Sequence, residues 1–316
     1  MPSNRSAFVD DKGKPLRVAD SAMPKPGADD IVVRNYAVAI NTIDPAQADG
    51  FQIRQYPTVL GHDLAGEVFD VGSNVTRFKK GGRVIGHARQ FRFLQVSQKT
   101  EPSACIRAFL LAMQPSYLTA CGFYEEGYMQ LDLPSLDAKP NGKVVVVYGG
   151  SSSVGIAAIQ LAVNAGYRVI ATSSSNNFDL CREAGASDVF DYKVETVAGD
   201  IAKAVCDDKF VGLYNAIGIP ESFDVVTPIM EKLNGGFLAN TKPLGKLPNF
   251  IDAKFVLGVG DFGFPVWDNF ITKALESGKL KCLPEAKVVG KGLESLQEAF
   301  EVRNGDVSAQ KVVVEL

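Results

Sequence analysis

The sequence has few cysteines, and their spacing does not suggest a metal or redox motif. Its 316 residues include five cysteines, which are scattered along the chain and form no Cys-x-x-Cys pair. An odd number of scattered cysteines argues against a disulfide framework and favours a reducing compartment. The five are Cys105, Cys121, Cys181, Cys206 and Cys282.

A long apolar run, a secretory leader and a strong charge excess are also absent. No apolar stretch approaches the roughly 20 residues that cross a bilayer, and the N-terminal segment MPSNRSAFVDDKGK has no apolar core of the kind a signal peptide needs. A net charge of -3 gives no electrostatic basis for binding nucleic acid or an anionic membrane. With 46% hydrophobic and 22% charged residues, the chain is predicted to be a cytoplasmic globular protein that is long enough for two domains.

The most informative segment that is present is Lys143–Gly155, KVVVVYGGSSSVG. Its β-branched residues predict a buried strand that stops at Tyr148-Gly149-Gly150, and a short serine loop follows. Residues 154–166 then carry apolar side chains at helical spacing. A strand, a glycine-rich loop and a helix in this order indicate a dinucleotide-binding unit, in which N–H groups at the helix start bind a pyrophosphate. The alternative is a buried strand and helix without a ligand.

Strand and helix patterns alternate after this loop. The alternation predicts a parallel, doubly wound sheet with right-handed crossovers. The strand candidates are Tyr167–Thr172, Asp188–Phe190, Val211–Asn215 and Gly236–Asn240, and the helix candidates are Phe178–Ala184 and Glu195–Val205.

The two ends of the chain have different patterns. Short strands separated by Pro, Gly and Asp predict a small, mostly antiparallel, barrel-like domain in the first part. Its strand candidates are Ser6–Val9, Leu16–Ala19, Ile31–Ile40 and Phe78–Ile85, with a polar loop over residues 41–50. After about residue 260 the alternation stops, and we expect helices at Trp267–Gly278 and Leu293–Val302 and a terminal strand at Gln310–Glu315.

Together these segments resemble the medium-chain dehydrogenase/reductase superfamily over nearly the whole chain. The resemblance rests on VLGHDLAGEV, GGRVIG, GGSSSVG and the closing GLESLQEAFEVRNGDVSAQKVVVEL. Within the superfamily the sequence is similar to zinc-independent quinone oxidoreductases and to fungal trans-enoyl reductases. The resemblance implies an α/β protein with a GroES-like β-barrel catalytic domain (residues 1–114 and 262–316) and a Rossmann domain with a doubly wound parallel sheet (residues 115–261).

The resemblance does not extend to the metal ligands of the zinc-dependent relatives. Where those relatives have a cysteine, this chain has Asn41–Asp44, and the four-cysteine structural zinc loop is missing. His62 matches their histidine ligand and Asp63 the acidic residue beside it, but Cys121 falls one residue away from the third ligand position. Since catalytic zinc needs about three protein ligands, no metal site is predicted. The alternative role for His62 is that of an ordinary hydrogen-bonded histidine under the barrel.

NADPH is the predicted cofactor. The second strand of the doubly wound unit ends without the carboxylate that binds the ribose of NAD, and the hydroxyls and amides there suit a 2′-phosphate. The resemblance assigns the pyrophosphate to Ser151, Ser152, Ser153 and Val154, and the 2′-phosphate to Ser174, Ser175, Asn176 and Asn177. It also places Tyr192 near the adenosine, and Ile217, Gly218, Val289, Thr42 and Asp44 near the nicotinamide. Arg168 and Arg182 flank the strand end and are candidates for a positive charge.

Reduction of a conjugated double bond is the predicted reaction. Without zinc to polarise an alcohol oxygen, alcohol oxidation is disfavoured, whereas the β-carbon of an α,β-unsaturated carbonyl accepts hydride if a hydroxyl or N–H steadies the enolate oxygen. The resemblance implies an NADPH-dependent oxidoreductase of the enoyl or quinone reductase type in fungal secondary metabolism, with Tyr56 and His62 as candidate catalytic residues. We expect a small-molecule substrate, a polyketide synthase or its product as partner, and a monomer or homodimer.

Two other functions stay open. The segment around residues 87–116 is shorter than in the family, where it lines the substrate cleft, and this suggests an NADPH-binding accessory protein with little catalysis. A zinc-type alcohol dehydrogenase is the other possibility. Residues 91–96 are expected to keep a remnant of a family strand.

Overall fold

The structure is a computed structural model that describes residues 4–87, 92–95, 113–258, 264–305 and 307–316. The chain divides into two compact units: the terminal unit, Met1–Gln114 with Glu285–Leu316, and the central unit, Pro115–Pro284. The sequence analysis expected the return to the first domain at residue 262, whereas the units divide after Pro284. The difference arises because residues 279–281 are hydrogen-bonded to the end of helix α4 (Ser153–Val163) in the central unit. Gln160 Nε2 of this helix donates to the Lys281 carbonyl, and Nδ2 of Asn164, which follows the helix, donates to the Lys279 carbonyl.

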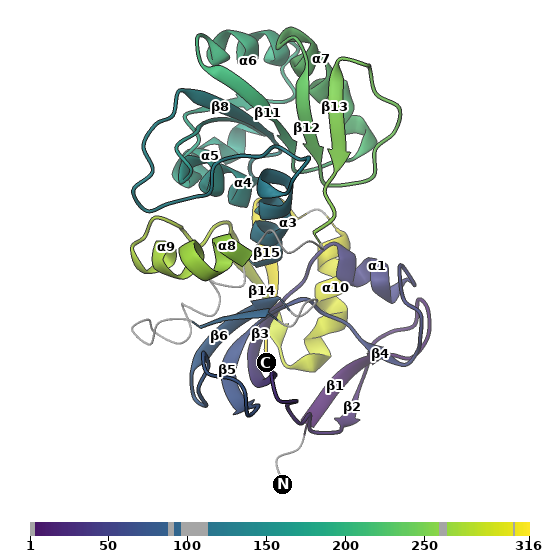
Figure 1. Ribbon diagram of the computed structural model, residues 1–316. Coiled ribbons are helices and arrows are strands. Elements are labelled where there is room, and N and C mark those ends of the chain that lie inside the picture. Colours follow the sequence, from purple (N-terminus) through teal and green to yellow (C-terminus); the bar gives the residue numbers. More distant parts are fainter. Residues whose placement is uncertain (1–3, 88–91, 96–112, 259–263, 306) are drawn as a thin grey trace. The chain divides into compact units, whose positions relative to one another are not determined.

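The described strands of the terminal unit form two sheets (Figure 1). The first is antiparallel, with the order β2-β1-β4, and contains β1 (Asn4–Val9), β2 (Arg17–Ser21) and β4 (Thr58–Val59). The second has the order β14-β15-β3-β5-β6-β7 and is antiparallel except for the parallel pair β14 and β15. It contains β3 (Ile31–Ala39), β5 (Asp63–Val71), β6 (Arg83–His87), β7 (Arg92–Gln95), β14 (Glu285–Lys291) and β15 (Gln310–Glu315). The mostly antiparallel pattern and the terminal strand are confirmed, and β7 forms a strand within the segment where a family strand was expected; that it is a remnant of that strand stays a prediction.

Residues 41–50 contain helix α1 (Ile43–Ala48), so the expected polar loop is wrong. Pro45 lies in the first turn, where its missing N–H is not needed. Asp44 Oδ2 accepts a hydrogen bond from the Asn41 N–H (2.6 Å) and so satisfies a backbone donor at the helix start. Ala48 then packs, with Phe300 of helix α10 (Leu296–Asn304), into the apolar cluster of this unit. The strand expected at Phe78–Ile85 starts further along the chain than predicted, because β6 begins at Arg83.

The central unit is built on a six-stranded parallel sheet with the order β10-β9-β8-β11-β12-β13. This is the strand order of a doubly wound dinucleotide-binding fold, and Figure 1 shows β8, β11, β12 and β13 side by side. The strands are β8 (Lys143–Tyr148), β9 (Arg168–Ser173), β10 (Asp188–Asp191), β11 (Lys209–Asn215), β12 (Gly236–Asn240) and β13 (Ile251–Phe255). The doubly wound sheet is confirmed, and β13 is an additional edge strand that the sequence analysis did not find.

Helices and short helical turns join these strands. The helices are α3 (Met113–Tyr124), α4 (Ser153–Val163), α5 (Phe178–Ala184), α6 (Val197–Val205) and α7 (Phe223–Lys232), with 3-10 turns η2 (Ser175–Asn177) and η3 (Pro220–Ser222). Helix α5 ends at Gly185, whose φ of +112° only glycine adopts readily. The expected helix after residue 266 is instead α8 (Phe264–Val266), a π-helix η5 (Trp267–Ile271) and α9 (Thr272–Glu276). In the terminal unit, the 3-10 turn η6 (Leu293–Ser295) precedes α10.

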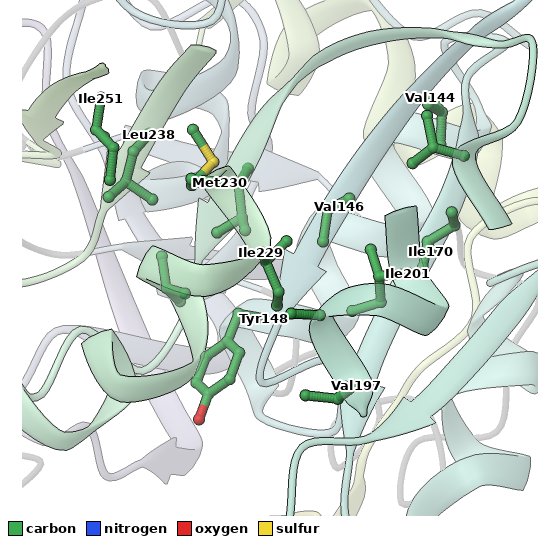
Figure 2. Close-up of a cluster of buried hydrophobic side chains, with 14 residues drawn as sticks. Val144, Val146, Tyr148, Ile170, Val197, Ile201, Ile229, Met230, Leu238 and Ile251 are labelled. Atoms are coloured by element: carbon green, nitrogen blue, oxygen red, sulfur yellow. The ribbon is translucent and has the colours of Figure 1, made fainter. Parts of the chain in front are cut away.

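The core of the central unit lies between the sheet and helices α6 and α7. Figure 2 shows Val144, Val146 and Tyr148 of β8 packed with Ile201 of α6 and Ile229 of α7. The run of β-branched residues in β8 is buried along its length, as expected of a central parallel strand. This packing fixes the carboxyl ends of the strands, where the candidate site lies. Within the part of the chain that the structure describes, no helix is both long and apolar enough to cross a membrane.

Candidate functional site

The loop after β8 turns tightly into helix α4, and glycine is required where the two meet. Gly149 has a φ of +76°, a conformation that residues with a Cβ rarely adopt. A Cβ on Gly155 would collide with the Gly149 carbonyl oxygen. Ser152 closes the loop, since its hydroxyl donates to the Gly149 carbonyl (2.8 Å) and accepts from the Gly155 N–H (3.0 Å). Ser153 and Val154 begin α4, and the N–H groups of this first turn form the kind of site that binds phosphate.

Three polar side chains meet beside this loop. Asn177 Nδ2 donates to Ser151 Oγ (3.4 Å) and to Ser174 Oγ (3.1 Å). Ser174 directly follows β9, and Asn177 is the last residue of η2. Ser175 and Asn176 lie exposed in the same turn. The structure therefore brings together Ser151, Ser174 and Asn177 as a neutral set of hydrogen-bonding groups, which we call the amide–hydroxyl cluster.

The loop is fixed to the neighbouring strands on both sides. Thr172 of β9 accepts from the Gly149 N–H through its hydroxyl (3.1 Å) and from the Gly150 N–H through its carbonyl (2.7 Å). On the β11 side, the Ile217 side chain occupies the space into which a Cβ on Gly149 would point. A predicted nicotinamide residue and the pyrophosphate loop are thus in direct contact.

The turn after β11 is fixed by a buried asparagine that the sequence analysis did not assign. Asn215 Oδ1 accepts from the N–H groups of Ile217 (3.2 Å) and Gly218 (2.9 Å), and its Nδ2 donates to Ser222 Oγ (2.8 Å). Gly218 has a φ of +65°, and a Cβ there would collide with the backbone N of Lys242 after β12. Asn215 therefore positions the two residues expected at the nicotinamide.

The two arginines that flank the end of β9 in sequence both pair with aspartates. Arg168 is the first residue of β9, at the opposite end of the strand, and its guanidinium pairs with Asp188 (2.8 Å) and Asp208 (2.7 Å). Arg182 pairs with Asp179 (3.1 Å) on helix α5. Arg168, one of the two candidates for a positive charge, is therefore placed at the wrong end of β9 to act on the residues that follow the strand.

A pair of tyrosines lies at the same carboxyl edge. The rings of Tyr148, at the end of β8, and Tyr192, after β10, meet edge to face with centroids 6.1 Å apart. Burial, with the nearby Tyr192 and Asp224, raises the pKa of Tyr148 to about 12. Tyr148 is therefore neutral at physiological pH and acts as an amphipathic support for Tyr192.

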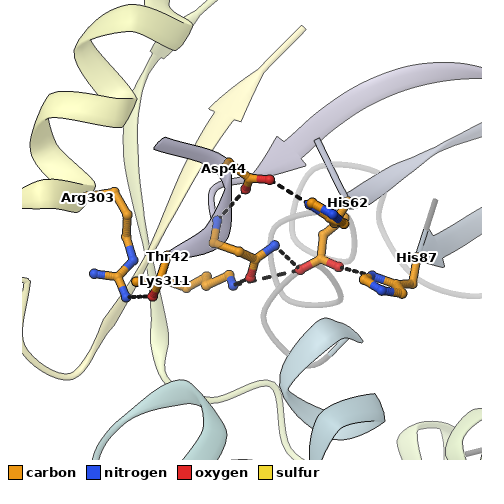
Figure 3. A network of polar contacts seen from close by, with 8 residues as sticks. Thr42, Asp44, His62, His87, Arg303 and Lys311 are labelled. Carbon is orange, nitrogen blue, oxygen red and sulfur yellow. Dashed lines mark hydrogen bonds and ion pairs between the residues drawn. The ribbon is translucent and has the colours of Figure 1, made fainter. Parts of the chain in front are cut away.

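The terminal unit contains a second group of polar side chains, drawn in Figure 3, which we call the dyad network. His62 Nδ1 lies 2.6 Å from Asp44 Oδ1, and His87 Nδ1 lies 3.1 Å from Asp63 Oδ1. The two imidazole rings are stacked, with centroids 5.7 Å apart. Asn41 joins the two pairs, because its backbone N–H donates to Asp44 and its Nδ2 donates to Asp63 (2.9 Å). All five residues are buried.

A lysine from the terminal strand β15 completes the dyad network. Lys311 Nζ donates to Asn41 Oδ1 and lies 3.7 Å from Asp63 Oδ2. Burial raises the pKa of Asp63, but the hydrogen bond from His87 and the charge of Lys311 outweigh it, so the net pKa of Asp63 lies below its usual value. Burial lowers the pKa of Lys311, against the attraction of Asp63 and Asp44. Lys311 and Asp63 are thus a buried ion pair.

Thr42 is held at the exposed edge of this network. The guanidinium of Arg303 in α10 donates a hydrogen bond to Thr42 Oγ1. Because a guanidinium can only donate, Thr42 accepts from Arg303 and keeps its own hydroxyl proton for another partner. Burial lowers the pKa of Arg303, although Asp44 acts in the opposite direction.

Two other predicted residues lie in apolar surroundings instead. Tyr56 and Val289 both pack against the apolar cluster that contains Val9, Ile40 and Phe300. Val289 falls where the pairing of β14 with β15 is shifted by a bulge. The dyad network contains His62, Asp44 and Thr42 but not Tyr56, so the structure favours a packing role for the Tyr56 ring.

The donor set around His62 does not fit a zinc site. The Nδ1 atoms of His62 and His87 are both used by carboxylates, and the cation of Lys311 lies within the same network. Among the residues that the structure describes, no group of three or more His, Cys, Asp or Glu side chains is placed to hold a metal ion. No step of the chemistry below depends on a metal.

Lys311, Arg303 and His87 were given no role by the sequence analysis. Lys311 had a detectable signal, because it directly precedes the apolar run Val312–Val314 of the terminal strand, and a buried lysine is almost always paired. Arg303 had no detectable signal in the sequence, since an arginine in the last turn of a predicted helix is usually an ordinary surface residue.

Comparison with known proteins identifies the family. An alcohol dehydrogenase GroES-like domain matches residues 27–132, and a zinc-binding dehydrogenase domain matches residues 153–234. The chain is 37% identical to Dehydrogenase orsE of Emericella nidulans over 100% of both chains, and 36% identical to Trans-enoyl reductase himH of Aspergillus japonicus over 91% of this chain and 90% of the relative. Escherichia coli quinone oxidoreductase complexed with NADPH has a similar fold, with a TM-score of 0.77 and 18% identity over 99% of this chain and 100% of that one.

A GroES-like domain combined with a doubly wound parallel sheet defines a two-domain dehydrogenase. The identity to whole relatives goes further, and the chain belongs to the medium-chain dehydrogenase/reductase superfamily of oxidoreductases. The predicted family and fold class are confirmed. The match with Dehydrogenase orsE runs over 351 positions, more than the 316 residues of this chain, so the relative has residues that this chain lacks. The predicted shortening around residues 87–116 lies largely outside the described residues.

Proposed function

We propose that the protein is an NADPH-dependent reductase of α,β-unsaturated carbonyl compounds or quinones. One observation carries this proposal: the tight loop that contains Gly149 and ends at Gly155 lies beside the neutral amide–hydroxyl cluster. Ser151 of this cluster belongs to the loop, and Ser174 and Asn177 follow the neighbouring strand β9. A pyrophosphate fits the first feature and a 2′-phosphate fits the second. When bound, NADPH would supply a hydride.

The residues present fit the dinucleotide. A Cβ at Gly155 would fill the space against the Gly149 carbonyl, so the backbone is open there only because the residue is glycine. At the end of β9, residues 173–177 are Ser-Ser-Ser-Asn-Asn and include no carboxylate to repel a 2′-phosphate. The fold shared with the quinone oxidoreductase complexed with NADPH supports this choice of cofactor.

The dyad network supports reduction of a conjugated double bond. Hydride addition at the β-carbon leaves negative charge on the carbonyl oxygen, and a single well-placed donor stabilises it. Thr42 is such a donor, because Arg303 occupies the acceptor side of its hydroxyl. Its O–H is therefore free to bind an enolate oxygen.

His62 is the proposed source of the proton that completes the reduction at the α-carbon. Since a carboxylate can only accept, Asp44 accepts a hydrogen bond from the Nδ1–H of His62 and orients the ring. The imidazolium form of His62 carries a second proton on Nε2, which it delivers to the α-carbon; this leaves the neutral ring with its Nδ1–H, and solvent restores the Nε2 proton. Asp44 acts here by positioning His62, because both of its oxygens are used by His62 and the Asn41 N–H.

The names of two relatives support an enoyl substrate. Trans-enoyl reductase himH and Trans-enoyl reductase tndF of Aspergillus flavipes are both named for the reduction of an enoyl group. We propose that the substrate is an enoyl intermediate of a secondary-metabolite pathway of the polyketide type. A polyketide synthase as partner, a cytoplasmic location, and a monomeric or dimeric state are further parts of this proposal.

The proposed function is tested by following NADPH consumption with purified protein and a panel of enones, enoyl thioesters and quinones. We expect turnover with at least one conjugated carbonyl or quinone and none with saturated ketones. Tight binding of NADPH without turnover across the panel would support the accessory-protein alternative. Oxidation of simple alcohols that a chelator abolishes would support a zinc alcohol dehydrogenase instead.

Substitution of Gly155 tests the pyrophosphate site. Gly155→Ala should raise the dissociation constant for NADPH about tenfold or more, because the added methyl group forces the loop away from α4 and misplaces the phosphate donors. Gly199→Ala in α6 is the control, since a Cβ there meets nothing within 4 Å. Fluorescence titration of both variants checks this, and equal affinities would contradict the placement of the pyrophosphate.

Substitution of Ser174 tests the preference for NADPH over NADH. Ser174→Asp places a carboxylate at the end of β9, where it repels a 2′-phosphate and binds the ribose hydroxyls of NADH. The ratio of KM for NADPH to KM for NADH should therefore rise at least tenfold. Ser187→Asp adds the same charge at the amino end of the neighbouring strand β10 and should leave the ratio unchanged. An equal change of this KM ratio in both variants would show that Ser174 does not lie beside the 2′-phosphate.

A further inference from the structure

The amide–hydroxyl cluster contains no positive charge, although the 2′-phosphate that it is proposed to bind carries about 1.5 to 2 negative charges at pH 7. Ser151, Ser174 and Asn177 are neutral donors and acceptors. Arg168 is engaged with Asp188 and Asp208 at the opposite end of β9, and Arg182 pairs with Asp179 on helix α5. A further exposed cation at this edge of the sheet would help to neutralise the phosphate.

The neighbouring strand places a lysine at this edge. Strand β10 pairs with β9 in parallel, with Asp191 opposite Ser173. Because adjacent strands are about 4.8 Å apart, the residues that follow Asp191 leave the sheet beside Ser174. These residues are Tyr192 and Lys193.

The turn after β10 is held in a defined conformation. The Lys193 N–H donates to Asp191 Oδ1 (3.0 Å), and the Val194 N–H donates to the Asp191 carbonyl (3.1 Å). The backbone of Lys193 is therefore fixed next to the end of β9. Asp191 Oδ1 is used by this backbone N–H.

The side chain of Lys193 lies against the ring of Tyr192. Its ammonium lies 5.8 Å from the centroid of the Tyr192 ring. The Tyr192 ring in turn meets Tyr148 at the end of β8, and β9 lies between β8 and β10. Tyr192 therefore reaches across the end of β9, and Lys193 lies over it with an exposed side chain that is accessible to a ligand.

We infer that Lys193 supplies the positive charge that binds the 2′-phosphate of NADPH, beside Ser174 and Asn177. Lys193 is thus a specificity-determining residue for NADPH over NADH. The inference rests on the proposed function, because it presupposes that the central unit binds a pyridine nucleotide.

The test is a titration of the full chain with NADPH and with NADH, followed by nucleotide fluorescence. Lys193→Ala should weaken NADPH binding about tenfold, the loss expected for one charge-assisted hydrogen bond, and leave NADH binding unchanged. Lys193→Arg should keep the preference. Lys203→Ala, which removes an exposed lysine of α6 that pairs with Asp200, is the matched control and should change neither affinity.

Ionic strength provides a second measurement. In the unmodified protein, added salt should weaken NADPH binding more than NADH binding, because salt screens exposed charges. In Lys193→Ala this difference should shrink. If the unmodified protein binds NADPH and Lys193→Ala leaves the ratio of the dissociation constants for NADPH and NADH unchanged, the role of Lys193 is overturned and the proposed function is not. Failure of the unmodified protein to bind either nucleotide would overturn the proposed function and this inference together.

Discussion

Asp63→Asn should lower the free energy of unfolding by about 3–5 kcal/mol, the cost of leaving a buried charge without its partner. The asparagine has nearly the same shape, so the main change is the loss of one negative charge. Lys311 Nζ, 3.7 Å from Asp63 Oδ2, would remain buried without its ion-pair partner. His87 Nδ1 would lose its carboxylate acceptor at the same time. Urea or thermal unfolding followed by circular dichroism measures the effect.

The pH dependence of stability gives this prediction a signature. The folded-state pKa of Asp63 is lowered, so its contribution is present above the ordinary pKa of about 3.9 and is lost as the pH falls towards the folded value. The Asp63→Asn variant should lack that loss at acidic pH. In the variant Lys311 keeps only the weaker attraction of Asp44, so its lowered pKa falls further, and stability should recover as the pH rises and the amine becomes neutral.

A double variant and a surface control separate the buried ion pair from general disruption. Asp63→Asn with Lys311→Met removes both charges and should recover most of the lost stability, because neutral replacement of a whole buried pair is often tolerated. Asp70→Asn removes the same group from an exposed pair with Lys80 and should have a much smaller effect. A double variant no more stable than Asp63→Asn would contradict the assignment of a buried ion pair.

The nucleotide loop shows why part of the molecule was predictable from sequence. The features of this loop and of the helix after β9 are local. β-Branched residues form β8, a serine caps α4, and Gly185 ends α5. Local patterns of this kind specify strand, loop and helix without reference to the rest of the chain. The amide–hydroxyl cluster was also accessible, because the carboxyl ends of neighbouring parallel strands always meet at one edge.

The dyad network shows why the rest was not predictable. Lys311 reaches Asn41 across 270 positions of sequence, and no local pattern reports such a contact. Arg168 was misplaced for a related reason: its nearness in sequence to the end of β9 concealed that a strand of six residues separates the two ends. The expected polar loop at residues 41–50 is helix α1 because the buried Asp44 caps it, and Asp44 is paired with His62, which directly precedes β5.

His62→Gln should lower kcat about 10²-fold, the lower end of the range for general acid catalysis, while KM for NADPH stays within twofold. The glutamine removes the imidazole that Asp44 orients, and with it the proton that Nε2 delivers to the α-carbon. Hydride would still reach the β-carbon, and water would protonate the enolate slowly. Steady-state kinetics with an enone substrate, with thermal unfolding as the check on folding, measures the change.

The stereochemistry of the product distinguishes a proton donor from a residue that only supports the fold. With an α-methyl enone, a proton from His62 arrives on one face and gives one configuration at the α-carbon, whereas water arriving from more than one direction gives a mixture. His62→Gln should therefore yield mixed configurations, and His87→Gln, which alters the other histidine of the same network, should keep a single one. A His62→Gln variant that is slow but still gives one configuration would show that another group, such as Tyr56, or a fixed water delivers the proton.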